Sequence, residues 1–179
     1  MDYNCNCRIF AWRLYQLIGI YMLDILQVAS YICQRYQKEF GVRIDEMKLH
    51  KLLYFTQREC LIQTAHPIFE AKFEAWKYGP VMPCIRQHYK DDSLHIPLSE
   101  EQKKPYRLVF DMVFKTYAQQ KSWSLSSLTH GEYSWKQARK GFGEQDSCEV
   151  EIKTEDIKTD ANRVRQRRFI LRQLNLYSA

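Results

Sequence analysis

The chain has 179 residues, of which 27% are charged and 45% are apolar, and its net charge is +6. This length suits one domain with a sizeable core and is too short for two ordinary domains. The composition excludes a disordered chain and a membrane protein, and the positive charge suits nucleic acid, an acidic partner protein, or neither.

The first 21 residues need their own interpretation. Arg8 and Arg13 precede a short apolar run at 14–21 that faintly resembles a secretory signal, but no small-x-small cleavage site follows it. The run is also much shorter than the ~20 apolar residues of a membrane span. We expect residues 1–21 to be an N-terminal appendage of the domain, or a translated leader ahead of a start at Met22.

Helical periodicity dominates the next forty residues. Apolar residues recur at three- and four-residue spacing until Gly41, which is expected to end the first helix in a left-handed conformation. Asp45 is a suitable N-cap for a second helix, which the pair His66-Pro67 stops. Because the second helix carries apolar residues on several sides, we expect it to be central.

Two short segments have the alternation of strands. Phe73 and Ala75 alternate with polar residues, and the same pattern recurs from Cys148 to Ile152. These two segments could pair in one small sheet.

A glycine and two prolines lie within a few residues after the first of these segments. They predict a rigid turn that carries Trp76 and Tyr78, and Pro83 suits the first turn of a short helix that reaches Lys90. A rigid turn with aromatic side chains either presents a contact surface or closes a core. The residues alone leave both interpretations open.

The second half of the chain also predicts helices. Ser99 to Gln102 matches a capping box, although Pro105 shifts the start of the regular helix. A short helix follows Ser122, and a further one is expected to begin at Ser134.

Thr154 is expected to cap a final helix. Its inner stripe consists of Ile157, Ala161, Val164 and Leu171. The fold class is therefore mainly α: a single compact helical domain with a small two- or three-stranded β element.

No catalytic site, metal site or cofactor is expected. The histidines are widely separated, and no HExxH pair or phosphate-binding glycine loop occurs. The six cysteines form no CxxC pair, and Cys60 and Cys84 lie where a small apolar residue would serve. We therefore expect reduced structural thiols, a cytoplasmic location and no enzyme activity.

Five arginines crowd the end of the final helix, with no acid after Asp160: Arg163, Arg165, Arg167, Arg168 and Arg172. A solvated helix face is the plainest interpretation. The alternatives are a docking surface for an acidic protein or for nucleic acid. No recognition helix of a helix-turn-helix is clearly marked.

Three segments, in order, resemble the hallmarks of the Panacea domain, a family of SocA-like antitoxins associated with phages and mobile elements. The segments are residues 47–57, 73–83 and 128–139. The middle one is the most specific, because a tryptophan, a tyrosine and a Gly-Pro pair rarely coincide. The expected organisation is an appendage or leader at 1–21, a Panacea-like domain at 22–161 and a basic C-terminal helix end at 162–179.

The resemblance implies an antitoxin that binds a cognate toxin directly and blocks it. The toxin would be encoded by a neighbouring gene, and its identity cannot be carried over because family members neutralise toxins of unrelated folds. Eight residues of the motifs are candidates for toxin binding or for support of the scaffold: Lys51, Tyr54, Trp76, Tyr78, Gly79, Pro80, His130 and Trp135.

A second function remains open at this stage. The net charge of +6 and the five arginines also suit a nucleic-acid-binding regulator of a phage or mobile-element operon, with operator DNA as its partner. A homodimer is compatible with either function.

Overall fold

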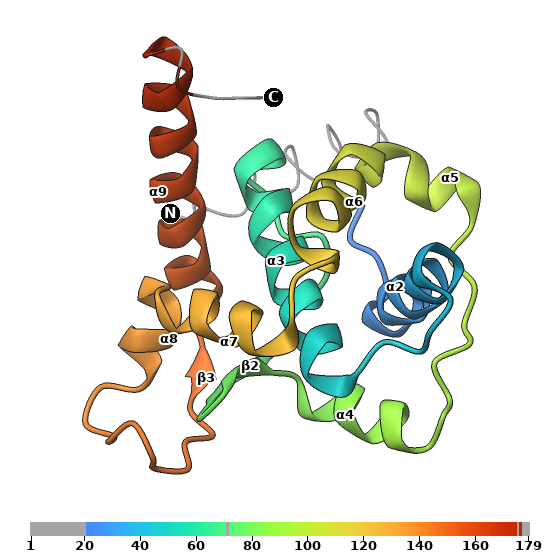
Figure 1. The fold of residues 1–179 in the computed structure, drawn as a ribbon, viewed down its shortest axis with the longest axis horizontal. Helices are drawn as coiled ribbons and strands as arrows, with labels where there is room; N and C mark the ends of the chain where they lie inside the picture. The colour runs from blue at the N-terminus through green and yellow to red at the C-terminus, as the bar shows by residue number, and fades with distance from the viewer. Residues whose placement is uncertain (1–20, 71, 175, 177–179) are drawn as a thin grey trace, which may run out of the picture.

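The computed structural model describes residues 21–70, 72–174 and 176 (Figure 1). The first 20 residues, with Cys5 and Cys7, lie outside this part, so the predicted appendage or leader is not tested. The described chain forms α2 (Ile25–Phe40), α3 (Glu46–Thr64), β1 (Phe73–Trp76), β2 (Gly79–Val81), α4 (Pro83–Lys90), α5 (Glu100–Lys103), the 3₁₀ turn η1 (Lys104–Tyr106), α6 (Arg107–Val113), the π-helical turn η2 (Phe114–Ala118), α7 (Ser122–His130), α8 (Tyr133–Ala138), β3 (Glu151–Ile152) and α9 (Thr154–Gln173). The predicted class, mainly helical with a small sheet, is confirmed.

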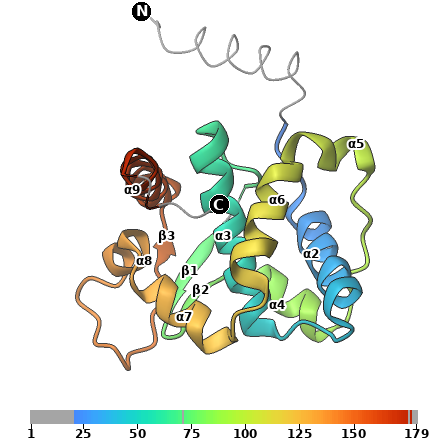
Figure 2. The ribbon, with the colours of Figure 1, turned by 45° about the horizontal axis from the view of Figure 1, so that its top comes forward.

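Helix α3 is the centre of the molecule. It lies between α2 and α6 on one side and α9 on the other (Figures 1 and 2). Every residue from Lys48 to Leu61 is buried, as the sequence predicted for a helix that is apolar on several sides. Because several buried residues of α3 are polar, they need hydrogen-bond partners from the elements around them. Those partners determine how the rest of the domain is held.

The helix ends follow local sequence signals. The Asp24 carboxylate caps α2 and the Asp45 carboxylate caps α3, while Gly41 ends α2 with φ of 71°. Pro105 converts one turn to 3₁₀ geometry, so the regular helix resumes at Arg107. The prediction for the last helix is wrong by one residue, because Lys153 occupies the N-cap position and Thr154 is already helical.

The sheet is antiparallel, with strand order β2-β1-β3. Phe73 lies opposite Ile152, which confirms the predicted pairing of the two alternating segments. The Gly-Pro pair does not form the turn, because Gly79 and Pro80 belong to β2 and the turn consists of Lys77 and Tyr78. Pro80 is tolerated there because β2 is an edge strand and needs no further N–H donor.

Polar contacts attach α9 to the core. The carboxylate of Asp160, which is 3% exposed, accepts the N–H groups of Tyr133 and Ser134 at 2.7 and 2.8 Å. It also accepts the Tyr54 hydroxyl at 3.3 Å. About two helical turns further along α9, a bidentate ion pair joins Arg168 to the buried Glu59 of α3, at 2.8 and 2.9 Å. Helix α9 is therefore fixed relative to α3 and α8.

Replacing Asp160 should weaken the whole domain. Asp160→Ala removes the acceptor of two backbone N–H groups and one hydroxyl, so we expect a loss of about 2–4 kcal/mol in the free energy of unfolding. Urea unfolding followed by circular dichroism measures this loss. Asp156→Ala, on the same helix, is the control and should change the free energy by less than about 0.5 kcal/mol. Equal effects of the two substitutions would contradict the assigned role.

Candidate functional site

The carbonyl groups of the β1–β2 hairpin accept hydrogen bonds from four side chains that come from distant parts of the sequence. The donor atoms are Arg139 Nη1 to the Ala75 carbonyl at 2.9 Å, Trp135 Nε1 to that of Trp76 at 3.0 Å, Ser126 Oγ to that of Tyr78 at 2.9 Å and Lys51 Nζ to that of Pro80 at 3.1 Å. These donors lie on α3, on α7 and on or just after α8. The three sequence motifs therefore meet at one hairpin.

Lys51 is the most unusual of these donors, because it is a cation in the interior. Its residue is 1% exposed, and among the described residues no carboxylate lies within ion-pair distance of its ammonium group. Burial lowers the pKa of Lys51 from its ordinary 10.5 to about 7. The Pro80 carbonyl is thus the main compensation for burying this side chain.

Gly79 makes the close approach of Lys51 and α7 to the hairpin sterically feasible. Its φ is 97°, which side-chain-bearing residues rarely adopt. A Cβ atom at this position would lie 2.3 Å from Thr129 Oγ1 and 2.8 Å from Lys51 Cε. Only glycine satisfies both the backbone conformation and the packing.

The outer end of the hairpin presents aromatic side chains to solvent. Tyr78 is 44% exposed and Trp123, at the start of α7, is 61% exposed. Their ring centroids lie 5.2 Å apart with an interplanar angle of 85°. The Lys77 ammonium group lies 5.0 Å from the centroid of the Tyr78 ring. We call Lys77, Tyr78 and Trp123 the aromatic tip.

Two cavities flank the aromatic tip, and Lys77 and Tyr78 line both. One, of about 500 Å³, opens between the hairpin and α3, and its wall includes Trp76, over whose ring the Arg86 guanidinium lies at 4.9 Å. The other, of about 400 Å³, is lined by the ring stack of His130 and Trp135, whose centroids are 4.3 Å apart. A partner could therefore contact the tip and fill a cavity on either side.

The eight motif residues proposed from the sequence fall into three groups. Tyr54, Lys51, Gly79, Pro80 and Trp135 are buried, whereas Trp76 and His130 are half-buried in the cavity walls and Tyr78 is exposed. The buried hydroxyl of Tyr54 bonds to the Ser134 hydroxyl at 2.9 Å. Sequence reasoning missed Ser126, Trp123 and Arg139, because nothing in the local pattern marks a serine, an exposed tryptophan or an arginine as a hairpin contact.

The five arginines of α9 lie apart from the hairpin and differ from one another. The guanidinium of Arg163 lies 4.6 Å from the centroid of the Tyr133 ring, and Arg165 donates to Asn162 at 3.0 Å. Arg168 pairs with Glu59, so its main contact is structural. Arg163, Arg165, Arg167 and Arg172 are exposed.

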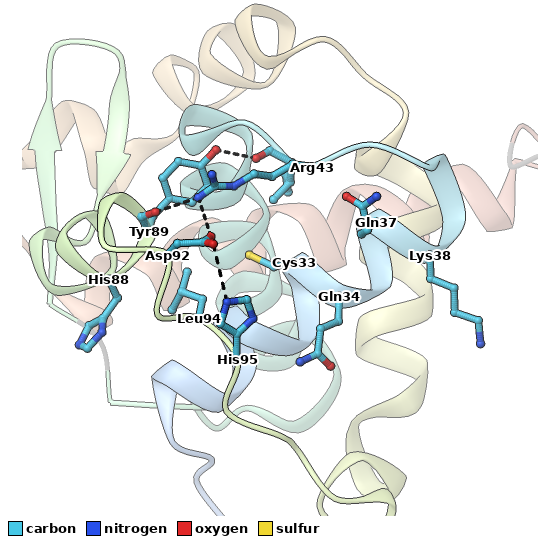
Figure 3. Close-up of a pocket in the computed structure, with 11 residues that line it drawn as sticks. Cys33, Gln34, Gln37, Lys38, Arg43, His88, Tyr89, Asp92, Leu94 and His95 are labelled. Atoms are coloured by element: carbon cyan, nitrogen blue, oxygen red, sulfur yellow. Dashed lines mark hydrogen bonds and ion pairs between the residues drawn. The ribbon is translucent and has the colours of Figure 1, made fainter.

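A further cavity, of about 460 Å³, lies between α2 and the loop that follows α4 (Figure 3). Arg43 crosses its rim, donating to the Tyr89 carbonyl at 2.9 Å and pairing with Asp92 at 3.1 Å. Cys33 lies within it, but burial raises the pKa of this thiol to about 11. None of the motif residues lines this cavity, and its polar contacts join the connection between α2 and α3 to α4 and to the loop that follows α4.

Among the described residues, Cys60 is a buried cysteine. Burial also raises the pKa of Cys60 to about 11, so its nucleophilic thiolate is rare at neutral pH. In the described part of the chain, no three His, Cys, Asp or Glu side chains are grouped so that they could hold a metal ion. None of the helices described there has the length and apolar character to cross a membrane.

Comparison with known proteins finds a family that matches the region around the hairpin. Residues 49–136 match the family described as "Antitoxin SocA-like, Panacea domain". The chain carries a SocA-like Panacea domain. The matched region contains the hairpin and three of its four side-chain donors, Lys51, Ser126 and Trp135.

One curated relative supports this family. Antitoxin SocA of Caulobacter vibrioides is 41% identical over 44 residues, which are 25% of this chain and 23% of that protein. The chain thus aligns with less than a quarter of that relative's length. No solved structure matches.

Gly79→Ala should destabilise the Panacea domain through both backbone strain and overlap with Thr129. Each contribution is on the order of 1–3 kcal/mol. The matched control is Gly141→Ala, because Gly141 also has positive φ, of 90°, but no atom lies within 4 Å of the added Cβ. We expect Gly79→Ala to lower the free energy of unfolding by at least about 1 kcal/mol more than Gly141→Ala does. Equal losses would show that the close approach is not a constraint.

The buried Lys51 should make stability depend on pH. Because its folded pKa is about 7 and its unfolded value is 10.5, the unfolded chain binds an extra proton between these values. Lys51 therefore makes stability rise with pH above about pH 7, by at most about 1.4 kcal/mol per pH unit. The measurement is the difference in unfolding free energy between the wild type and Lys51→Met from about pH 6 to pH 9. This difference should be flat below pH 7 and rise above it; parallel curves throughout would contradict the burial of the ammonium group.

Proposed function

We propose that this Panacea-domain protein is an antitoxin that neutralises a cognate toxin by binding it directly, with no chemical step of its own. The observation that carries the proposal is that the match to the SocA-like family centres on one hairpin whose outer end exposes an aromatic tip. The toxin is expected to be the product of a neighbouring gene, and the two proteins are expected to meet in the cytoplasm.

The aromatic tip has the properties of a binding hot spot. Tyrosine and tryptophan are enriched among residues that dominate interface energies, particularly where a rigid scaffold presents them. Tyr78 is held by the hydrogen bond from Ser126 to its carbonyl and by the contact of its ring with Trp123. Little conformational freedom remains to be lost on binding, which favours affinity.

The buried motif residues then have a different role from the exposed ones. Lys51, Gly79 and Trp135 keep the hairpin in position, while the tip and the cavity rims meet the toxin. In this division of roles, the exposed rim can vary in sequence while the buried scaffold stays the same.

Co-expression with the neighbouring gene tests the function, and substitutions at the tip test the surface. The double variant Tyr78→Ala/Trp123→Ala should weaken toxin binding by about 10- to 100-fold, because two exposed aromatic contacts are lost. The melting temperature should change little, since both side chains lie at the surface outside the core. Leu108→Ala is the control, because Leu108 is also exposed, at 74%, but lies on α6.

The outcomes separate the two claims. A neighbouring product that is harmless alone, or that stays toxic in the presence of the wild-type protein, would contradict the antitoxin function. Full neutralisation by the double variant would leave the function standing and reject the tip as the contact surface.

A nucleic-acid-binding regulator is the second candidate, and the exposed arginines of α9 favour it. Arg163, Arg165 and Arg167 could contact phosphates of operator DNA. Binding of this kind falls steeply as salt rises, because counterions are released from the DNA. Fluorescence anisotropy with duplex DNA at increasing salt tests it, and a flat response or no binding at low salt would remove this candidate.

A further inference from the structure

The end of α9 exposes large apolar side chains as well as arginines. Phe169, Ile170 and Leu174 are 62%, 55% and 60% exposed. In Figure 1, the C-terminal half of α9 stands along one edge of the molecule and extends beyond the end of α3. Three such residues within two helical turns are a costly exposure of apolar surface unless a partner covers them.

Helical geometry places the apolar and basic side chains on shared faces. Ile170 and Leu174 follow Arg163 and Arg167 at spacings of three and four residues, so these four form one stripe. Phe169 lies about 100° around the helix from Ile170, close to the face that carries Arg165. The inner face, which includes Ile157 and Ala161, is buried against the core and is not part of this surface.

Charge decides between the occupants that could cover this surface. A second copy packed through the same turns would bring arginines against arginines, because residues 161–174 contain no acid. The first 20 residues would not supply the missing charge either, since they contain Arg8 and Arg13 but only one acid, Asp2. Nucleic acid would satisfy the arginines, but the aliphatic side chains of Ile170 and Leu174 gain little from phosphates.

We propose that the last three turns of α9 dock an acidic amphipathic segment of the toxin. Its apolar side chains would cover Phe169, Ile170 and Leu174, and its carboxylates would pair with Arg163, Arg165 and Arg167. This proposal rests on the antitoxin function, but it concerns a surface separate from the aromatic tip. It would give the protein two contacts with its partner.

The helix end is held ready for such a contact. The bidentate pair between Arg168 and Glu59, at 2.8 and 2.9 Å, fixes α9 immediately before the exposed turns. The carboxylate of Asp160 fixes it two turns earlier. Because these anchors are internal, changes on the exposed face should leave the fold intact.

The test uses the full chain and the neighbouring gene's product. The triple variant Phe169→Ser/Ile170→Ser/Leu174→Ser should bind this toxin at least about tenfold more weakly than the wild type, with an unchanged melting temperature. Leu174→Ser alone changes only the end of the helix. This milder variant should lose less affinity for the toxin than the triple variant does. Arg165→Gln/Arg167→Gln should mainly slow association and make it less sensitive to salt.

Each alternative result overturns the docking proposal or assigns a different partner to this surface. If the wild type binds the toxin and both serine variants bind it equally well, the docking proposal is overturned while the antitoxin function stands. If the serine variants convert a dimer to a monomer in sedimentation experiments without affecting toxin binding, the occupant is a second copy. If Arg165→Gln/Arg167→Gln is the one variant with an effect, and that effect is weaker binding to DNA with unchanged binding to the toxin, the surface binds nucleic acid. A wild-type protein that does not bind the toxin at all overturns the proposed function itself.

Discussion

A lysine ammonium group buried beside the central helix needs an acceptor, and the carbonyl group of Pro80 provides it. This hydrogen bond, 3.1 Å long, joins α3 to the edge strand of the sheet. It requires Gly79, because any larger residue would overlap with Lys51 and Thr129. The same hairpin is joined to α7 and to α8 by Ser126 and Trp135. Removing the lysine would therefore leave the hairpin with a weaker attachment to α3.

This arrangement explains why the three motifs are separated in sequence and yet act as one unit. Each supplies either the hairpin or a side chain that fixes it. The residues that remain outside, Tyr78 and Trp123 above all, are supported by this framework without contributing to it strongly. The division between an interior that holds the hairpin and an exterior that is open to a partner follows from burial alone.

Local features of the fold were predictable from the sequence. The caps at Asp45 and Gly41 depend on a few neighbouring residues, and the strand alternation indicated two segments that could pair, as Phe73 and Ile152 do. The Gly-Pro pair was predicted to form the turn, but it lies in β2. A glycine with positive φ and a proline are common in turns, and both are also tolerated in an edge strand.

Long-range polar contacts were not predictable. Glu59 and Arg168 are separated by 109 positions, and no local pattern marks either as a partner of the other. Asp160 looked like an ordinary helix carboxylate, although it fixes α8 and Tyr54. For the site, the sequence identified the motif residues but could not separate the buried ones from the exposed Tyr78. That separation depends on how distant helices pack around the hairpin.

Hydrogen exchange of the protein alone and in complex with the toxin tests the central claim most directly. The account predicts slower exchange on binding at the turn formed by Lys77 and Tyr78, around Trp123 and in the last turns of α9. The amides of α3, which are already protected in the core, should exchange at the same rate in both states. Slower exchange confined to the cavity beside Cys33 and Arg43, with none at the hairpin, would contradict it.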